Sequence, residues 1–111
     1  MKHVLAATLL ALAGTAHAAN ALDGLTHDQC NALAQLAFDG AQMRDDGATL
    51  TQAKAGVYVG AQNAHFSDRV KDVLMDVVTL TYRDSEFRFN SPSMIGGNVY
   101  GSCMAMHAAH K

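Results

Sequence analysis

Apolar residues recur at helical spacing along most of the chain, and two long segments begin with residues that favour a helix N-terminus. Thr26 followed by Gln29 is the capping-box pattern, and it predicts a first helix over 27–45. Ser67 precedes 68–83, where apolar and charged residues separate onto opposite sides most cleanly. We expect this amphipathic segment to lie at the centre of the core.

The segment 49–63 fits a helix less well. Small and apolar residues recur on one side after a threonine that can cap the segment, but Gly56 and Gly60 each cost about 1 kcal/mol relative to alanine in a helix. A strand at 56–60 is the competing interpretation. No partner strand is evident elsewhere in the sequence, so the pattern favours a helix.

A last helix is expected from Ser91-Pro92 to about residue 109, because serine favours the N-cap position and proline the first turn. Gly96-Gly97 is expected to delay the regular start of this helix to Asn98. Together with the abundance of alanine, these patterns predict an all-α fold, a small bundle of about four helices.

The first eighteen residues predict a secretory signal peptide. A basic start precedes an apolar run of about ten residues, and Ala16-His17-Ala18 fits the cleavage pattern. The alternative is an N-terminal buried helix. Cleavage of residues 1–18 leaves residues 19–111 as a single helical domain, which we expect to be periplasmic or secreted, with no membrane span after cleavage.

The chain contains two cysteines, Cys30 in the first predicted helix and Cys103 in the last. An even number of cysteines in an exported protein predicts a disulfide, here one that links the first and last helices. The alternative is a pair of buried free thiols. A bridge that closes a loop of roughly 70 residues contributes about 4 kcal/mol in the chain-entropy model.

Composition and motifs exclude several classes of function. Eight Lys and Arg against ten Asp and Glu give a net charge of −2 without a basic run, so we expect no nucleic-acid binding. The sequence has no nucleophile-elbow, phosphate-loop, zinc-protease or haem-attachment motif. We therefore expect a non-enzymatic protein without a cofactor.

One stretch between the third and last predicted helices has the composition of a binding surface. Charged residues alternate there with two phenylalanines, which favours a short extended segment, and paired Phe and Arg are typical interface anchors. The expected partner is a periplasmic protein. The alternative is that both phenylalanines close the end of the bundle. The candidate partner-binding residues are Arg83, Glu86, Phe87, Arg88 and Phe89.

The C-terminal segment offers an alternative function, periplasmic copper binding. Thioether and imidazole groups suit copper, and the candidate ligands are Met104, Met106, His107 and His110. Cys103 leaves this set if it is oxidised. The competing interpretation is an ordinary buried stripe followed by a last turn whose cations favour the helix dipole.

Small residues form stripes on three of the predicted helices, which lets helix axes approach closely. The pattern favours tight packing within the monomer, and the alternative, a homodimer or partner contact, stays open. In the last helix the stripe consists of Gly97, Gly101, Ala105 and Ala108.

Three short motifs resemble those of small exported bacterial helical proteins of unknown function. They are the early Cys30, the turn Arg44-Asp45-Asp46-Gly47 (RD-x-G) and Tyr100-Gly101-Ser102-Cys103 (Y-x-x-C). The resemblance implies a helical fold in which the two cysteines are paired, and it implies no activity. In size, helix content and compartment the chain is also similar to periplasmic immunity proteins, an analogy of fold and compartment alone.

Overall fold

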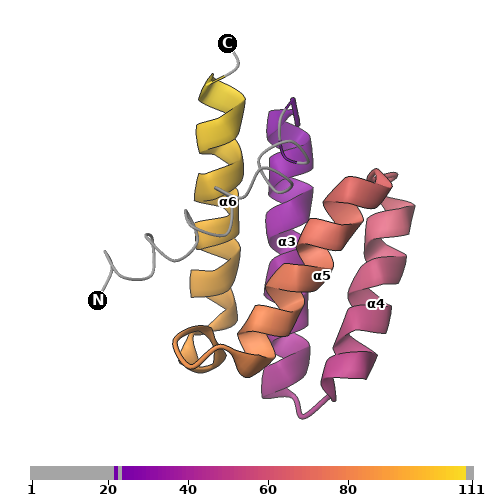
Figure 1. Cartoon of the computed structure of the whole chain (residues 1–111), viewed down its shortest axis with the longest axis vertical. Helices are drawn as coiled ribbons and strands as arrows, with labels where there is room; N and C mark the ends of the chain where they lie inside the picture. Colours follow the sequence, from indigo (N-terminus) through magenta and orange to yellow (C-terminus); the bar gives the residue numbers. More distant parts are fainter. Residues whose placement is uncertain (1–21, 23, 110–111) are drawn as a thin grey trace.

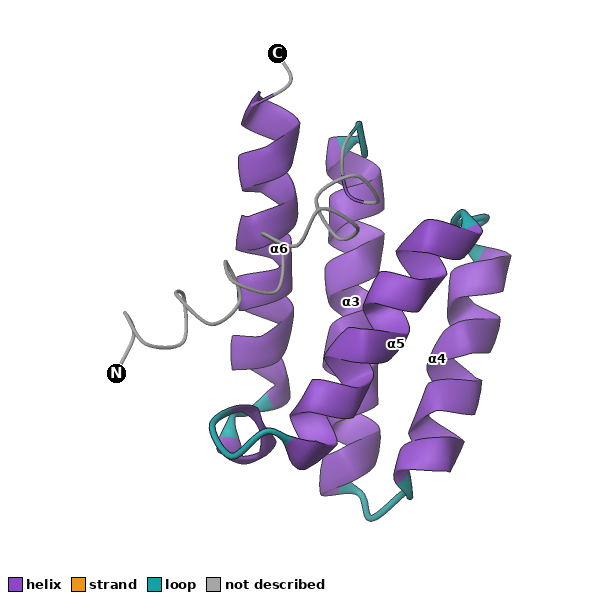
Figure 2. Cartoon of the chain, in the orientation of Figure 1, coloured by secondary structure: helices purple, strands orange, loops and turns teal. Residues whose placement is uncertain are grey.

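The computed structural model describes Leu22 and residues 24–109 of the 111-residue chain (Figure 1). In chain order the elements are α3 (His27–Asp45), α4 (Leu50–Asn63), α5 (Asp68–Arg83), the 3-10 helix η1 (Phe87–Phe89) and α6 (Pro92–Ala109). The predicted all-α bundle of four helices is confirmed, and the described residues contain no strand (Figure 2). The predicted signal peptide, residues 1–18, lies outside the described residues.

Side-chain caps fix the starts of α3 and α4. Thr26 Oγ1 accepts a hydrogen bond from Gln29 N at 3.1 Å, while Gln29 Oε1 accepts one from Thr26 N at 2.8 Å. Thr49 and Gln52 form the same capping box at the start of α4. From this cap α4 runs through 56–60 as an uninterrupted helix, so the strand interpretation of this stretch is wrong.

Helix α3 lies at the centre of the bundle, although the sequence pattern predicts that place for α5. Figure 1 shows α4 and α6 on opposite sides of α3, with α5 crossing it. Helix α3 packs against all three other helices, whereas α5 packs chiefly against α3, α4 and η1. The expectation for α5 is therefore wrong. A strongly one-sided helix covers a core from outside, while a helix contacted on several sides needs small or apolar residues around more of its circumference.

Small residues on α3 allow these close helix contacts. Ala37, Gly40 and Ala41 are buried, and side chains from α4 and α5 fill the space beside Gly40. A Cβ atom added at Gly40 would lie 3.0 Å from Val78 Cγ2 and 3.4 Å from Val57 Cγ2. Three helices therefore meet at a position that leaves little room for a side chain.

Replacing Gly40 with alanine should lower the free energy of unfolding by about 1 kcal/mol, because overfilling a packed site costs about 1–3 kcal/mol and helix propensity returns about 1 kcal/mol. Val78 is β-branched and its rotation about χ1 is restricted, so its side chain cannot easily move away from the added methyl group. Gly101→Ala is the matched control: a Cβ atom there meets open space, and stability should rise by about 1 kcal/mol. Urea unfolding measures whether each substitution lowers or raises the free energy of unfolding. A stabilised Gly40→Ala protein would show that the site can relax.

Helix α6 is regular from its first residue, and the predicted delay past its glycine pair is wrong. Ser91 Oγ caps the helix by accepting a hydrogen bond from Met94 N at 3.1 Å. Packing against α3 then holds Gly96-Gly97 in helical conformation, since a Cβ atom at the first glycine would lie 3.2 Å from the Ala34 carbonyl oxygen.

In the described part of the chain, no helix is both long and apolar enough to cross a membrane.

The disulfide between Cys30 and Cys103 joins α3 to α6. Both cysteines are fully buried, and Ile95 and Val99 continue the buried stripe of α6 along the same seam. The two helices run antiparallel, and α6 packs chiefly against α3 (Figure 1). The predicted link between the first and last helices of the bundle is confirmed, and it lies within their main contact.

Lys71 lies on the polar side of the α5 pattern but is nearly buried. Its Nζ atom is 3.2 Å from Asp68 Oδ1 and 4.9 Å from the centre of the Tyr58 ring. The hydrogen bond with Asp68 is the main cause that raises the pKa of Lys71 above its ordinary value. The lysine therefore stays charged at neutral pH, and it ties α4 to α5 until the solution becomes strongly alkaline.

Candidate partner-binding surfaces

Arg44, in the last turn of α3, organises the end of the bundle that lies opposite the disulfide. Its guanidinium donates to three backbone carbonyl oxygens, those of Thr81 at 2.9 Å, Phe87 at 3.1 Å and Asn90. Asp45 accepts hydrogen bonds from Nε and Nη2 and thereby orients the guanidinium. Because the Arg44 side chain is largely buried, these charge-assisted bonds fasten the segment after α5 to α3.

The segment held by Arg44 forms the 3-10 helix η1, so the predicted extended piece is wrong. Asp84 Oδ1 starts the turn by accepting hydrogen bonds from the backbone N–H groups of Glu86 and Phe87. With three residues per turn, Phe87 and Phe89 point to different sides. Phe87 is 1% exposed and fills the core, whereas Phe89 is 77% exposed.

Exposed charged and large apolar residues lie in η1 and close to it along the chain, and we call them the corner surface. The Arg88 guanidinium carbon lies 4.8 Å from the centre of the Phe89 ring, within the range of a cation–π contact. Met94, in the first turn of α6, adds a large apolar side chain that the sequence pattern does not single out. Phe87 is the one predicted binding residue that this surface lacks. The corner surface consists of Arg83, Glu86, Arg88, Phe89 and Met94.

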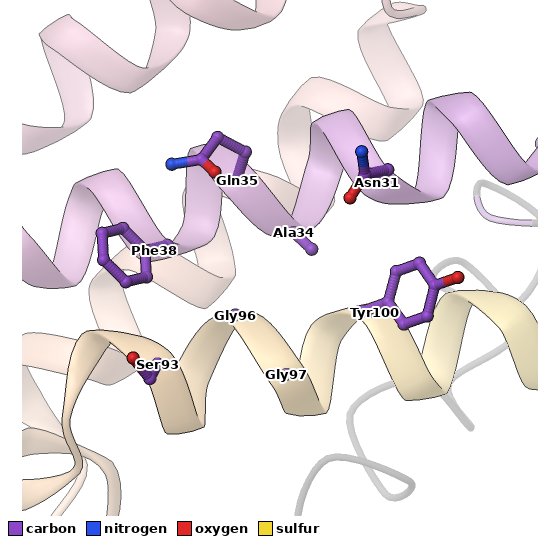
Figure 3. A pocket seen from close by; sticks show the side chains of 8 residues that line it. All are labelled: Asn31, Ala34, Gln35, Phe38, Ser93, Gly96, Gly97 and Tyr100. Carbon is purple, nitrogen blue, oxygen red and sulfur yellow. The ribbon is translucent and has the colours of Figure 1, made fainter.

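An open groove of about 320 Å³ runs between α3 and α6. Figure 3 shows the Tyr100 ring rising from α6 toward Asn31, and the Phe38 ring on α3 toward the other end. Sequence patterns do not reveal the groove, because its two walls meet only through tertiary packing. The lining residues are Asn31, Ala34, Gln35 and Phe38 of α3, and Ser93, Gly96, Gly97 and Tyr100 of α6.

Of the four predicted copper ligands, the structure describes Met104, Met106 and His107. Met104 and Met106 pack against the core. His107 Nδ1 lies 2.8 Å from the Leu25 carbonyl oxygen, so this nitrogen carries the proton and donates. His110 lies outside the described residues, and the described ones contain no group of three or more His, Cys, Asp or Glu that could hold a metal ion. Copper binding by these residues stays a prediction.

The small-residue stripe of α6 is exposed over much of its length, and at Gly97 it borders the groove between α6 and α3. Gly97, Gly101 and Ala105 are exposed, and a Cβ atom at either glycine would meet no other residue's atoms within 4 Å. The expectation of tight packing within the monomer is therefore wrong at these glycines, because α6 packs chiefly against one helix. A homodimer contact through this face stays a prediction.

His27 and Tyr100 join the N-terminal end of α3 to α6. His27 Nε2 lies 2.7 Å from the Tyr100 hydroxyl oxygen, and the two rings meet edge to face. Asp28 Oδ1 is 3.7 Å from His27 Nδ1, too far for a hydrogen bond, so it does not orient the imidazole as the carboxylate of a catalytic triad would. The contact therefore reinforces the seam beside the disulfide.

No protein-family model, characterised protein or solved structure matches this chain. The resemblance to small exported helical proteins stays a prediction. Geometry singles out two surfaces, the corner surface and the groove between α3 and α6. The two adjoin along the chain, because Ser93 of the groove precedes Met94 of the corner surface.

Proposed function

We propose that this protein is an exported, non-enzymatic binding module whose corner surface contacts a partner protein. Single exposed apolar residues are common on protein surfaces. Phe89 differs because it is 77% exposed on a fastened segment, with Arg88 against its ring and Met94 nearby in the chain. This rigidly presented aromatic ring is the observation that carries the proposal.

Rigid placement of Phe89 lowers the cost of binding. Fixing the backbone of one flexible residue costs about 1–2 kcal/mol, and a loop that becomes ordered on binding adds this cost to association. Arg44 reduces this cost before a partner arrives, because it bonds the carbonyl groups of Phe87 and Asn90 on either side of the exposed ring. Aromatic and arginine side chains also dominate the energetics of protein interfaces, and Arg88 already lies against the ring.

The disulfide supports an exported location for this function. Disulfides persist in oxidising compartments such as the periplasm and are rare in the cytosol. A bundle cross-linked between α3 and α6 is also a rigid scaffold, on which binding residues keep a fixed geometry. The analogy with periplasmic immunity proteins makes a toxin or an envelope protein the first class of partner to test.

Partner capture with Phe89→Ala tests the proposal. Truncation of a central aromatic anchor costs about 2 kcal/mol or more, which exceeds a tenfold loss of affinity. From a periplasmic extract, immobilised and oxidised wild type should retain a protein that Phe89→Ala retains at least about tenfold less. Val59→Ala is the matched control, since Val59 is an exposed apolar residue on α4, across α3 from α6 (Figure 1).

Circular dichroism should show the same helix content in all three proteins, because neither side chain belongs to the core. Val59→Ala should capture the partner as well as wild type does. Equal capture by wild type and Phe89→Ala would refute the corner surface as the binding site. An equal loss in both variants would show that the effect is not local to Phe89, and it would also count against the proposal.

A further inference from the structure

The groove between α3 and α6 has a neutral lining that is rich in hydrogen-bonding groups (Figure 3). Asn31, Gln35, Ser93 and Tyr100 supply polar atoms, and none of the eight lining residues is charged. Within the described part of the chain, the side chains of Asn31 and Ser93 form no hydrogen bond. These groups are therefore open to a ligand that replaces water.

The two amides on α3 have the spacing of an extended peptide. Asn31 and Gln35 are four residues apart, which is about 6 Å along a helix axis. In an extended chain, peptide groups that face one side repeat every two residues, at about 6.5 Å. Gln35 Nε2 donates to Asp39 Oδ1 at 3.0 Å, which leaves Gln35 Oε1 as an acceptor. The amides can thus bond alternate peptide groups of a strand that lies along the groove.

The two helices touch at the bottom of the groove, and glycines leave its α6 side without large side chains. Gly96 approaches α3 so closely that a Cβ atom there would lie 3.2 Å from the Ala34 carbonyl oxygen and 3.3 Å from Phe38 Cβ. Gly97 has open space where its Cβ atom would be, so a ligand backbone can come close to the helix. Phe38 and Tyr100 add apolar ring faces toward the two ends (Figure 3).

We propose that this groove binds an extended, uncharged peptide segment of the partner, an inference that rests on the proposed binding function. A helical segment fits less well, because its own backbone groups are already paired and cannot bond to the amides of Asn31 and Gln35. A charged segment would lose hydration without meeting an opposite charge on the lining. The groove adjoins the corner surface at Ser93 and Met94, so a single partner can occupy both.

A displayed library of random heptapeptides, panned against the oxidised wild-type protein, supplies the probe. We expect the enriched peptides to be poor in Asp, Glu, Lys and Arg. Fluorescence anisotropy with labelled copies measures their affinity. Gly97→Leu should bind these peptides at least about tenfold more weakly, because the new side chain enters the groove. The double variant Asn31→Ala/Gln35→Ala should lose a similar share of the affinity, because it lacks the two amides that bond to the peptide backbone.

Gly101→Leu is the matched control for the groove. Gly101 is as open as Gly97 and lies one turn further along α6, but it does not line the groove. Leucine is a better helix former than glycine, so both variants should fold with an undiminished Tm. Gly101→Leu should bind the peptides as wild type does. Equal losses in the two leucine variants would place the contact on the outer face of α6 and overturn the proposal.

Three further outcomes would each overturn the groove site: no enriched peptide, enrichment of charged peptides, or equal binding by wild type and Gly97→Leu. Phe89→Ala separates this inference from the corner surface. It should leave the affinity for the peptides unchanged while it loses the partner. Retained peptide binding together with undiminished partner capture by Phe89→Ala would overturn the corner surface and leave the groove in place.

Discussion

Replacing Cys30 and Cys103 together with alanine should lower the free energy of unfolding by about 4 kcal/mol. The two residues are 73 positions apart in the sequence. In the chain-entropy model, a cross-link over a loop of this length removes about 4 kcal/mol of conformational entropy from the unfolded state. Since small domains are stable by only about 5–15 kcal/mol, the loss is a large share of the total. Urea unfolding of the oxidised wild type and of the variant measures it.

Wild type unfolded in the presence of a reductant is the control for this prediction. Its cysteines become accessible once the chain opens, so it should lose about as much stability as the double variant without any change of sequence. A difference below about 1 kcal/mol between the oxidised wild type and either form would contradict the prediction. Helix packing along the seam between α3 and α6 would then hold α6 without help from the bridge.

Replacing Arg44 with alanine should lower the free energy of unfolding by about 3 kcal/mol. A hydrogen bond from a charged donor contributes about 1.5–3 kcal/mol, but bonds within one network are not additive, so the loss stays below their sum. Arg44→Lys should recover only part of it, because an ammonium lacks the planar fork whose Nη1 reaches the carbonyls of Thr81 and Phe87 while Nη2 reaches that of Asn90. Urea unfolding ranks the three proteins.

Arg83→Ala is the matched control, because this arginine is exposed at the end of α5 and its removal should change stability by less than about 0.5 kcal/mol. In Arg44→Ala, amide hydrogen exchange should accelerate over residues 87–90, while α4 changes less. Unchanged exchange over residues 87–90 would mean that the buried Phe87 ring alone holds the segment. The proposed rigidity of Phe89 would then need another source.

Local patterns predict the helices of this chain because a cap acts over only three or four residues. Thr26 and Thr49 start helices where the sequence places them. The disulfide is equally predictable, since Cys30 and Cys103 allow a single pairing within the chain. Local patterns do not predict how the helices are arranged in space. Amphipathicity ranks α5 first, but α3 is central because its small residues let neighbours approach from several sides.

The candidate surfaces depend on contacts that no local pattern contains. Arg44 has the pattern of a helix C-terminus, but its carbonyl partners lie 37 to 46 residues away in the sequence. An extended segment would place Phe87 and Phe89 on the same side, whereas the 3-10 turn separates them. The alternation of Phe and Arg therefore indicates a stretch of chain, but it does not tell which ring is exposed. The groove is invisible to such patterns for the same reason.

The seam between α3 and α6 joins segments that lie far apart along the chain, and this bears on how the protein matures. Helices α3, α4 and α5 follow one another through short turns and can assemble early, whereas docking of α6 must close a much longer loop. Both sulfur atoms are fully buried once α6 is in place, and thiol oxidation requires access. We therefore expect the disulfide to form in a partly folded chain, so that the supply of oxidant sets when the last helix becomes fixed to the first.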